Sequence, residues 1–135
     1  MTGTIHLPED LELICEMARS FPEDVQAAHD RLHARVPFSA ERGYYGLSRP
    51  EGGAIVYRAA AGLLPGESGA GSEVIRIKKG RYAAMLVADF MKDVPAIGEA
   101  FRTLLSNPAL DPDSWCVERY EGKDVRCMVR LRDGV

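Results

Sequence analysis

An internal repeat is the feature that most constrains the fold of this chain. The segments FPEDVQAAHDRL (21–32) and FMKDVPAIGEAF (90–101) carry Phe, Asp, Val and Ala at the same offsets. The shift from Phe21 to Phe90 is about half of the 135 residues. Between the copies lies LPGESGAGS, whose glycines and serines favour a flexible loop. We therefore predict a duplication: one domain, 1–135, made of two repeats at about 8–63 and 73–132 joined by this linker.

The second repeat predicts a strand, a helix and two further strands. EVIRIKKGRYAAMLVADF predicts one long strand bent at Gly80, because glycine permits a bulge. Asp93 is a suitable N-cap, and Pro95 is tolerated in the first helical turn. Helical spacing predicts one apolar stripe, formed by Val94, Ile97, Phe101, Leu104 and Leu105. SWCVERY and DVRCMVRLR are the two closing strands.

The first repeat has the same order of elements. DLELICEMAR predicts a strand, and Asp24 caps a helix that buries Val25, Ala28 and Leu32, with Val36 near its end. GYYGLS and AIVYRAAAG predict a strand pair that turns at RPEGG, which would make Tyr45 and Tyr57 cross-strand partners. The expected fold class is α+β: a duplicated β-α-β-β with pseudo-twofold symmetry, an antiparallel or mixed sheet, and helices on one face.

Composition and charge exclude several functions. The net charge of −3 argues against direct nucleic-acid binding and against anionic membranes, and no apolar run approaches the ~20 residues of a membrane span. The densest basic cluster, Arg76, Lys78, Lys79 and Arg81, is interpreted as a solvated strand edge. Three cysteines without close spacing predict no metal site and no cofactor, and their odd number without a signal peptide fits the cytoplasm.

The hairpin VERYEGKDV contains the main candidate site residue. Alternation along DVRCMVRLR places Val125, Cys127 and Val129 on one apolar face. A two-residue turn or a four-residue loop sets Glu118 opposite Cys127, on that apolar face beside Tyr120, whereas a three-residue loop would place it among arginines. An inward carboxylate without a partner costs several kcal/mol or has a raised pKa. Tyrosine hydroxyls, an arginine, or a cavity open to water or a ligand would offset that cost.

These residues resemble the GyrI-like domain, the effector-binding domain of bacterial AraC- and MerR-type regulators. The resemblance rests on a Tyr-Ala pair (Tyr82, Ala83), the following amphipathic helix, and a Glu-x-Tyr strand (Glu118, Tyr120) before the closing strand. The chain departs from the family pattern after the Tyr-Ala strand, where it lacks a glycine, and at the last strand, which ends VRLRDG.

The resemblance implies a pseudo-dimer of two halves around a groove, with Glu118 in a ligand cavity that faces organic cations. It makes the chain a stand-alone module that binds aromatic or cationic small molecules. The residues expected at the ligand are Glu118, Tyr82, Tyr120, Tyr45, Tyr57, Trp115 and Phe38. By strand alternation, Trp115 points away from Glu118.

Other functions remain open at this point. A hydrolase of reactive small molecules would use Glu118 as general acid or base, with Tyr82. A protein-interaction role would follow the gyrase inhibitor that gives the family its name, or a regulator that supplies the DNA contact, since no helix-turn-helix fits before Leu11. The chain would be a monomer or a homodimer. His29 and His33 share a helix face but have no third ligand, so they are interpreted as a solvated pair rather than a metal site.

Overall fold

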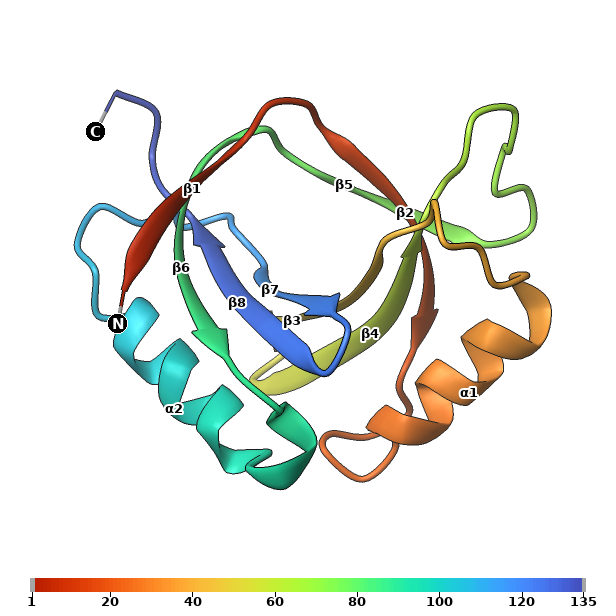
Figure 1. Ribbon diagram of the computed structural model, residues 1–135, viewed down its shortest axis with the longest axis horizontal. Coiled ribbons are helices and arrows are strands. Elements are labelled where there is room, and N and C mark those ends of the chain that lie inside the picture. Colours follow the sequence, from red (N-terminus) through yellow and green to blue (C-terminus); the bar gives the residue numbers. More distant parts are fainter. Residues whose placement is uncertain (1, 135) are drawn as a thin grey trace. The chain divides into compact units, whose positions relative to one another are not determined.

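The computed structural model describes residues 2–134; Met1 and Val135, the ends of the expected domain, lie outside the described residues. The chain divides into two compact units. Unit 1 comprises Met1–Asp10 and Lys78–Val135, and unit 2 comprises Leu11–Ile77. Each unit is a four-stranded antiparallel sheet with one α-helix against one face (Figure 1). The expected α+β fold is confirmed.

The two units have matching strand orders. In unit 1 the order is β1-β6-β8-β7 and in unit 2 it is β3-β4-β2-β5, with every described pair antiparallel. The elements of unit 1 are β1 (Gly3–Leu7), β6 (Gly80–Val87), the short 3-10 helix η1 (Phe90–Lys92), α2 (Pro95–Leu104), β7 (Cys116–Glu121) and β8 (Asp124–Arg130). Those of unit 2 are β2 (Leu11–Met17), α1 (Val25–Arg35), β3 (Tyr44–Glu51), β4 (Ala54–Gly62) and β5 (Glu73–Ile77).

Each half of the sequence supplies an edge strand to the sheet built mainly by the other half. β1 pairs with β6, and β5 pairs with β2, so each β-α-β-β set gains an edge strand from the other half of the sequence. The prediction of one long strand over 73–90 was therefore wrong, because the chain leaves the ladder at Lys78 and Lys79. Gly80 restarts it with φ 135°, a conformation that favours glycine. The sequence analysis did not anticipate β1.

Both helices bury the stripe that their periodicity predicts, with one difference. α1 packs Ala28 and Leu32 against its sheet, as expected. α2 packs Ile97, Phe101 and Leu104, but Val94 and Leu105 are about half exposed. The predicted stripe of α2 is therefore wider than the buried one, and an apolar flank of that helix remains open.

The helix caps differ from the sequence predictions. Asp24 is at the N-cap of α1, yet its carboxylate accepts from the backbone N–H of Arg19 and from Arg31 instead of from the helix amides. α2 begins one residue later than expected, with Val94 at the N-cap in place of Asp93. Pro95 occupies the first turn, as predicted.

The turn between β3 and β4 is also shifted. The hairpin closes at Gly52 and Gly53, which both have positive φ, and Pro50 lies inside β3. Two successive positive φ values are the requirement of the tight hairpin turns that match strand twist. Tyr45 therefore pairs with Ala60, and the expected Tyr45–Tyr57 pairing was wrong.

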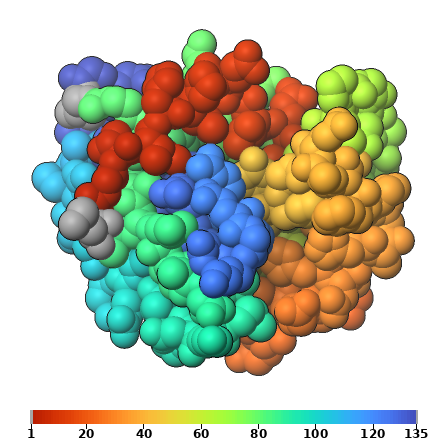
Figure 2. All heavy atoms as spheres, viewed as in Figure 1, coloured from red at the N-terminus to blue at the C-terminus, as the bar shows by residue number. Residues whose placement is uncertain are grey.

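The glycine- and serine-rich segment 64–72 is a surface loop, visible in yellow-green in Figures 1 and 2. Glu67 anchors it, because its carboxylate accepts from the Leu64 backbone and forms an ion pair with Arg42 at 2.7 Å. Across residues 2–134, the helices are all too short or too polar to span a membrane.

Candidate ligand-binding site

The β7–β8 hairpin has the register that places Glu118 on the apolar face. Glu118 lies opposite Cys127 and Tyr120 opposite Val125, around a two-residue turn at Gly122 and Lys123. Val125 and Cys127 belong to the cluster that packs under α2. This confirms the register expected from strand alternation and excludes the alternative that set Glu118 among arginines.

The Glu118 carboxylate has a tyrosine as its partner and no cation. The Tyr120 hydroxyl donates to Glu118 Oε1 at 2.7 Å. Within residues 2–134 no Arg, Lys or His forms an ion pair with Glu118, although the residue is only half-buried. The hairpin's arginines are engaged elsewhere, since Arg119 and Arg126 both donate to Glu121, on the opposite face. The hairpin therefore pairs Glu121 with two arginines, whereas Glu118 has no counter-charge from residues 2–134.

Burial dominates the electrostatics around Glu118. Desolvation raises the pKa of its carboxyl above the ordinary value, and the hydrogen bond from Tyr120 opposes that rise. The same desolvation raises the pKa of Cys116 to about 11 and that of Cys127 to about 12. The surroundings are therefore poor in water and offer the carboxylate little compensation, so an external cation would gain from its negative charge.

Two aromatic side chains, Tyr120 and Phe90, lie next to each other on the side of Glu118 that carries its hydrogen bond. The rings of Phe90 and Tyr120 lie 5.6 Å apart. Phe90 follows Asp89, whose backbone is left-handed with φ 48°. Two hydrogen bonds fasten this segment to the β7–β8 turn. Phe90 N donates to Lys123 O, and Asp89 N donates to a carboxylate oxygen of Asp124. The segment before α2 is thus fastened to the same hairpin that carries Glu118.

Gly98 leaves space on the exposed flank of α2. A Cβ atom at this position would meet no described atom within 4 Å beyond its own helix backbone. The repeat places His29 of α1 at the position of Gly98. The flank of α1 that carries His29 faces β3 and β4, since His29 lies against Tyr57 and His33 against Tyr44. Gly98 has no side chain with which to make the corresponding contacts in unit 1.

The structure does not bring the other unit 1 candidates to Glu118. Tyr82 pairs with Arg130 and lies on the opposite face of the sheet, where it is fully buried. Its hydroxyl donates to Lys78 O at 2.6 Å, and burial raises its pKa to about 12. Trp115 is buried just before β7, outside the cluster under α2.

The three unit 2 candidates have separate surroundings. Tyr57 is buried under α1, where its hydroxyl is hydrogen-bonded to His29 Nε2 at 2.8 Å. Tyr45 is buried on the other face of that sheet. Phe38 is 77% exposed and stacks on Tyr44, with ring centroids 5.8 Å apart.

Sequence reasoning missed Phe90, Gly98 and the role of His29. His29 is not the solvated residue that was expected: burial, and then the charge of His33, lower its pKa to about 4. The repeat alignment contained the signal, because it pairs Phe21 with Phe90 and His29 with Gly98. No group of three or more metal-binding side chains occurs in the described part of the chain.

Comparison with known proteins gives structural neighbours only. No protein-family model and no curated protein sequence matches the chain. Among solved structures, an integron cassette protein from the mobile metagenome of Vibrio cholerae is 12% identical over 97% of this chain and 95% of that chain, with a TM-score of 0.72. The protein SAV2435 bound to tetraphenylphosphonium is 14% identical over 98% and 94%, with a TM-score of 0.66. A hydrolase from Listeria innocua is 10% identical over 97% and 91%, with a TM-score of 0.55. These likenesses establish a shared fold.

Proposed function

We propose that this chain is a GyrI-like module that binds small organic cations, with the Glu118 carboxylate as the counter-charge. The observation that carries the proposal is the half-buried Glu118, which has a raised pKa, a tyrosine hydrogen bond and no cation partner within residues 2–134. A ligand that supplies the positive charge would remove the cost of this arrangement.

An aromatic, lipophilic cation suits the surroundings best. Tyr120 and Phe90 present ring surfaces beside the carboxylate, and cations gain ~0.5–2 kcal/mol over aromatic faces. Cysteines and apolar side chains of the cluster under α2 provide a low-polarity environment in which a charge pair is stronger than in water. SAV2435, a neighbour in fold, is a protein whose structure holds such a cation, tetraphenylphosphonium.

Calorimetric titration with tetraphenylphosphonium tests the proposal. We expect saturable binding to the wild type and at least tenfold weaker binding to Glu118→Gln, which keeps the shape and removes the charge. Glu41→Gln removes the same charge from an exposed glutamate of unit 2 and should bind like the wild type. Equal affinities of wild type and Glu118→Gln would refute the role of the carboxylate.

The pH dependence of binding provides a second check. The cation requires ionised Glu118, whose pKa burial raises, so affinity should fall as the pH drops through that raised pKa. In Glu118→Gln the affinity should be independent of pH over the same range. A wild-type affinity that rises on acidification would contradict the assignment.

The aromatic residues are proposed to contribute unequally. Tyr120 should contribute directly to ligand binding. Tyr120→Phe removes its hydrogen bond to the Glu118 carboxylate and should therefore change the affinity for the cation. The expected roles of Tyr82, Tyr45, Tyr57, Trp115 and Phe38 at the ligand remain proposals. Among these five residues, Tyr82 is the most informative one to substitute, by Tyr82→Phe, because it lies on the sheet face opposite Glu118.

A hydrolase is the second candidate, favoured by the raised pKa of Glu118, which suits a general acid. Protonated Glu118 would donate its proton to the leaving group while a water molecule attacks the electrophilic carbon, and Tyr120 would hold the carboxyl in place. Turnover of a reactive alkylating compound that disappears in Glu118→Gln would support this function. Binding of that compound without product formation would exclude it.

A further inference from the structure

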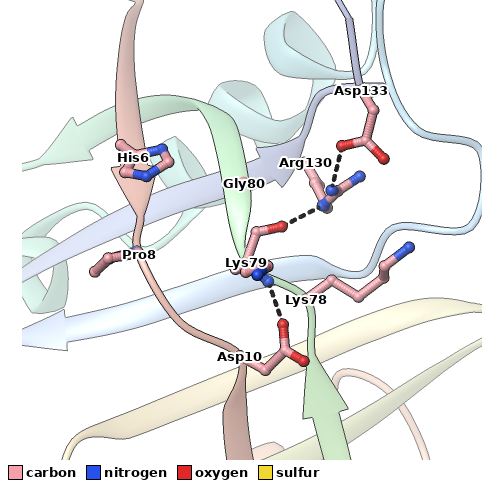
Figure 3. Close-up of a pocket in the computed structure, with 8 residues that line it drawn as sticks. All are labelled: His6, Pro8, Asp10, Lys78, Lys79, Gly80, Arg130 and Asp133. Carbon is pink, nitrogen blue, oxygen red and sulfur yellow. Dashed lines mark hydrogen bonds and ion pairs between the residues drawn. The ribbon is translucent and has the colours of Figure 1, made fainter.

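A pocket lies in unit 1, on the sheet face opposite Glu118. It has a volume of about 470 Å³, in the range of small-molecule sites, and opens where β1 ends and β6 begins (Figure 3). Arg130 lies at its base, and Lys78, Lys79 and Asp10 lie along its sides. This pocket uses the lysine pair that strand alternation had suggested to be only a solvated edge.

The base of the pocket is a buried arginine held in one orientation. The side chain of Arg130 is 7% exposed. Nε donates to Lys79 O at 2.9 Å, and Nη1 donates to Asp111 at 3.0 Å and to Leu131 O at 3.2 Å. Nη2 is the remaining nitrogen, and it donates to Asp133 at 2.7 Å. The guanidinium therefore presents a single nitrogen, Nη2, to an exchangeable partner.

Gly80 makes room for this arrangement. A Cβ atom at Gly80 would lie 2.8 Å from Arg130 Nη2 and 3.1 Å from its Nε, closer than side-chain carbons pack. The backbone of Gly80 also has φ 135°, which other residues rarely adopt. A glycine at this position thus lets the strand approach the guanidinium and keeps the space around Nη2 clear.

Asp133 is an exposed carboxylate on a buried cation. Its side chain is 82% exposed, whereas that of Arg130 is 7% exposed. The hydrogen bond from Arg130 and then its positive charge lower the pKa of Asp133, and the charge of Lys78 adds to this effect. When Asp133 leaves, Asp111 still pairs with Arg130, so the buried guanidinium keeps a counter-charge and the exposed Asp133 can be exchanged. Arg130 and Lys78 therefore favour a carboxylate oxygen at the position that Asp133 occupies.

We propose that this pocket binds the carboxylate of a small organic acid, which replaces Asp133 at Arg130 Nη2 and draws on Lys78. When Asp133 leaves, the cations that line the pocket are Lys78, Lys79 and Arg130, and among the described residues the carboxylates that remain are Asp10 in the lining and Asp111 on Arg130. One positive charge is then uncompensated, which matches one carboxylate. Asp10 is not free to compete, because its carboxylate accepts from the Lys79 backbone at 2.8 Å.

Titration of the ¹⁵N-labelled full chain with succinate, followed by NMR, tests this site. At low ionic strength we expect saturable shifts of the Lys79, Gly80 and Asp133 amides. Asp133→Asn removes the competing carboxylate and should bind succinate about tenfold more tightly. Lys78→Gln should bind about tenfold more weakly, and Lys92→Gln, which removes an equally exposed charge from η1, should match the wild type.

Two further ligands separate the carboxylate from other chemistry. Succinamide has the same carbon skeleton without charge and should not bind. Inorganic phosphate should bind more weakly than succinate; equal or tighter binding of phosphate would overturn the assignment to carboxylates. Absence of saturable shifts, or equal affinity of Asp133→Asn and wild type, would overturn the site itself. Since these residues lie away from Glu118, failure here leaves the proposed cation site untouched.

Discussion

The two units build the same scaffold and fill it differently. In each, the repeat phenylalanine before the helix packs on a tyrosine of the sheet: Phe21 on Tyr57 at 5.9 Å, and Phe90 on Tyr120 at 5.6 Å. The tyrosines come from different strands, however. Tyr57 is on β4 opposite Ser48, whereas Tyr120 is on β7 opposite Val125. The aromatic contact is thus retained while its tyrosine changes strand.

The helices complete the contrast. In unit 2, His29 closes the space above the sheet by its hydrogen bond to Tyr57. In unit 1, Gly98 takes that repeat position and has no side chain, and Glu118 lies opposite Cys127 on the apolar face. Unit 2 pairs the polar groups of His29 and Tyr57 with each other, whereas unit 1 has at Glu118 a carboxylate without a cation partner among residues 2–134 and at Gly98 a position without a side chain. The comparison teaches that two copies of one scaffold can differ sharply through one helix side chain, because the repeat position of His29 in unit 2 is Gly98 in unit 1.

Truncation of a core leucine should have the largest effect on stability, and the effect should be similar in the two units. Leu32 and Leu104 are 0% and 1% exposed and occupy the helix–sheet cores of the two units. We expect Leu32→Ala and Leu104→Ala each to lower the free energy of unfolding by about 2–5 kcal/mol. Denaturant titration measures both. A loss below about 1 kcal/mol in one unit only would show that its core is not equally packed.

Acid should destabilise unit 2 through His29. The folded pKa is about 4, below the ordinary histidine value, so the folded state binds fewer protons than the unfolded state. The stability that His29 contributes is present above its unfolded pKa and is lost as the pH falls toward 4, by at most roughly 3 kcal/mol. Thermal unfolding of wild type and His29→Gln across this range should show a shallower acid loss in the variant; identical slopes would count against it.

Glu118 should produce the opposite response in unit 1. Its folded pKa is raised, so the stability associated with its protonated form is lost as the pH rises through that value. Glu118→Gln should therefore be more stable than wild type at pH 7, by about 1.4 kcal/mol for each unit of the rise, and equal to it in acid. Urea unfolding at the two pH values provides the measurement. A variant that is less stable at pH 7 would indicate a stabilising partner for the carboxylate.

The smallest expected effect concerns the helix glycine. Gly98→Ala meets open space, so it should stabilise α2 by about 0.5–1 kcal/mol through helix propensity alone. The reverse change in α1, Ala34→Gly at an exposed position, should cost a similar amount. Melting temperatures of the pair would sharpen the comparison. A destabilised Gly98→Ala would mean that the space beside α2 is narrower than it is here.

Local sequence patterns predicted what local physics determines. The helices followed from their apolar spacing, and the register of the β7–β8 hairpin followed from alternation and a two-residue turn, which placed Glu118 correctly. The β3–β4 turn was misplaced because Pro50 was taken as a turn residue, although two adjacent glycines better satisfy a hairpin that needs positive φ twice.

The pairing partners of the strands and the contacts between side chains could not be predicted from the sequence, because they depend on residues distant along the chain. Nothing in residues 73–77 specifies whether they continue into β6 or pair with β2, since both choices bury the same alternating face. Likewise, Tyr82 resembles a ligand residue by motif, yet its position in β6 directs it to the face opposite Glu118. The contact of His29 with Tyr57 depends on tertiary packing, although the repeat counterpart of His29, Gly98, was visible in the alignment.

The exchange of edge strands has a consequence for proteolysis. A cut in the surface loop at 64–72 separates β1 and β2 from β5 and β6, but β1 is hydrogen-bonded to β6 and β5 to β2. Neither fragment can keep a whole sheet by itself, and each supplies the missing ladder of the other. A nicked molecule should therefore remain associated as a non-covalent heterodimer until denaturant releases both pieces together.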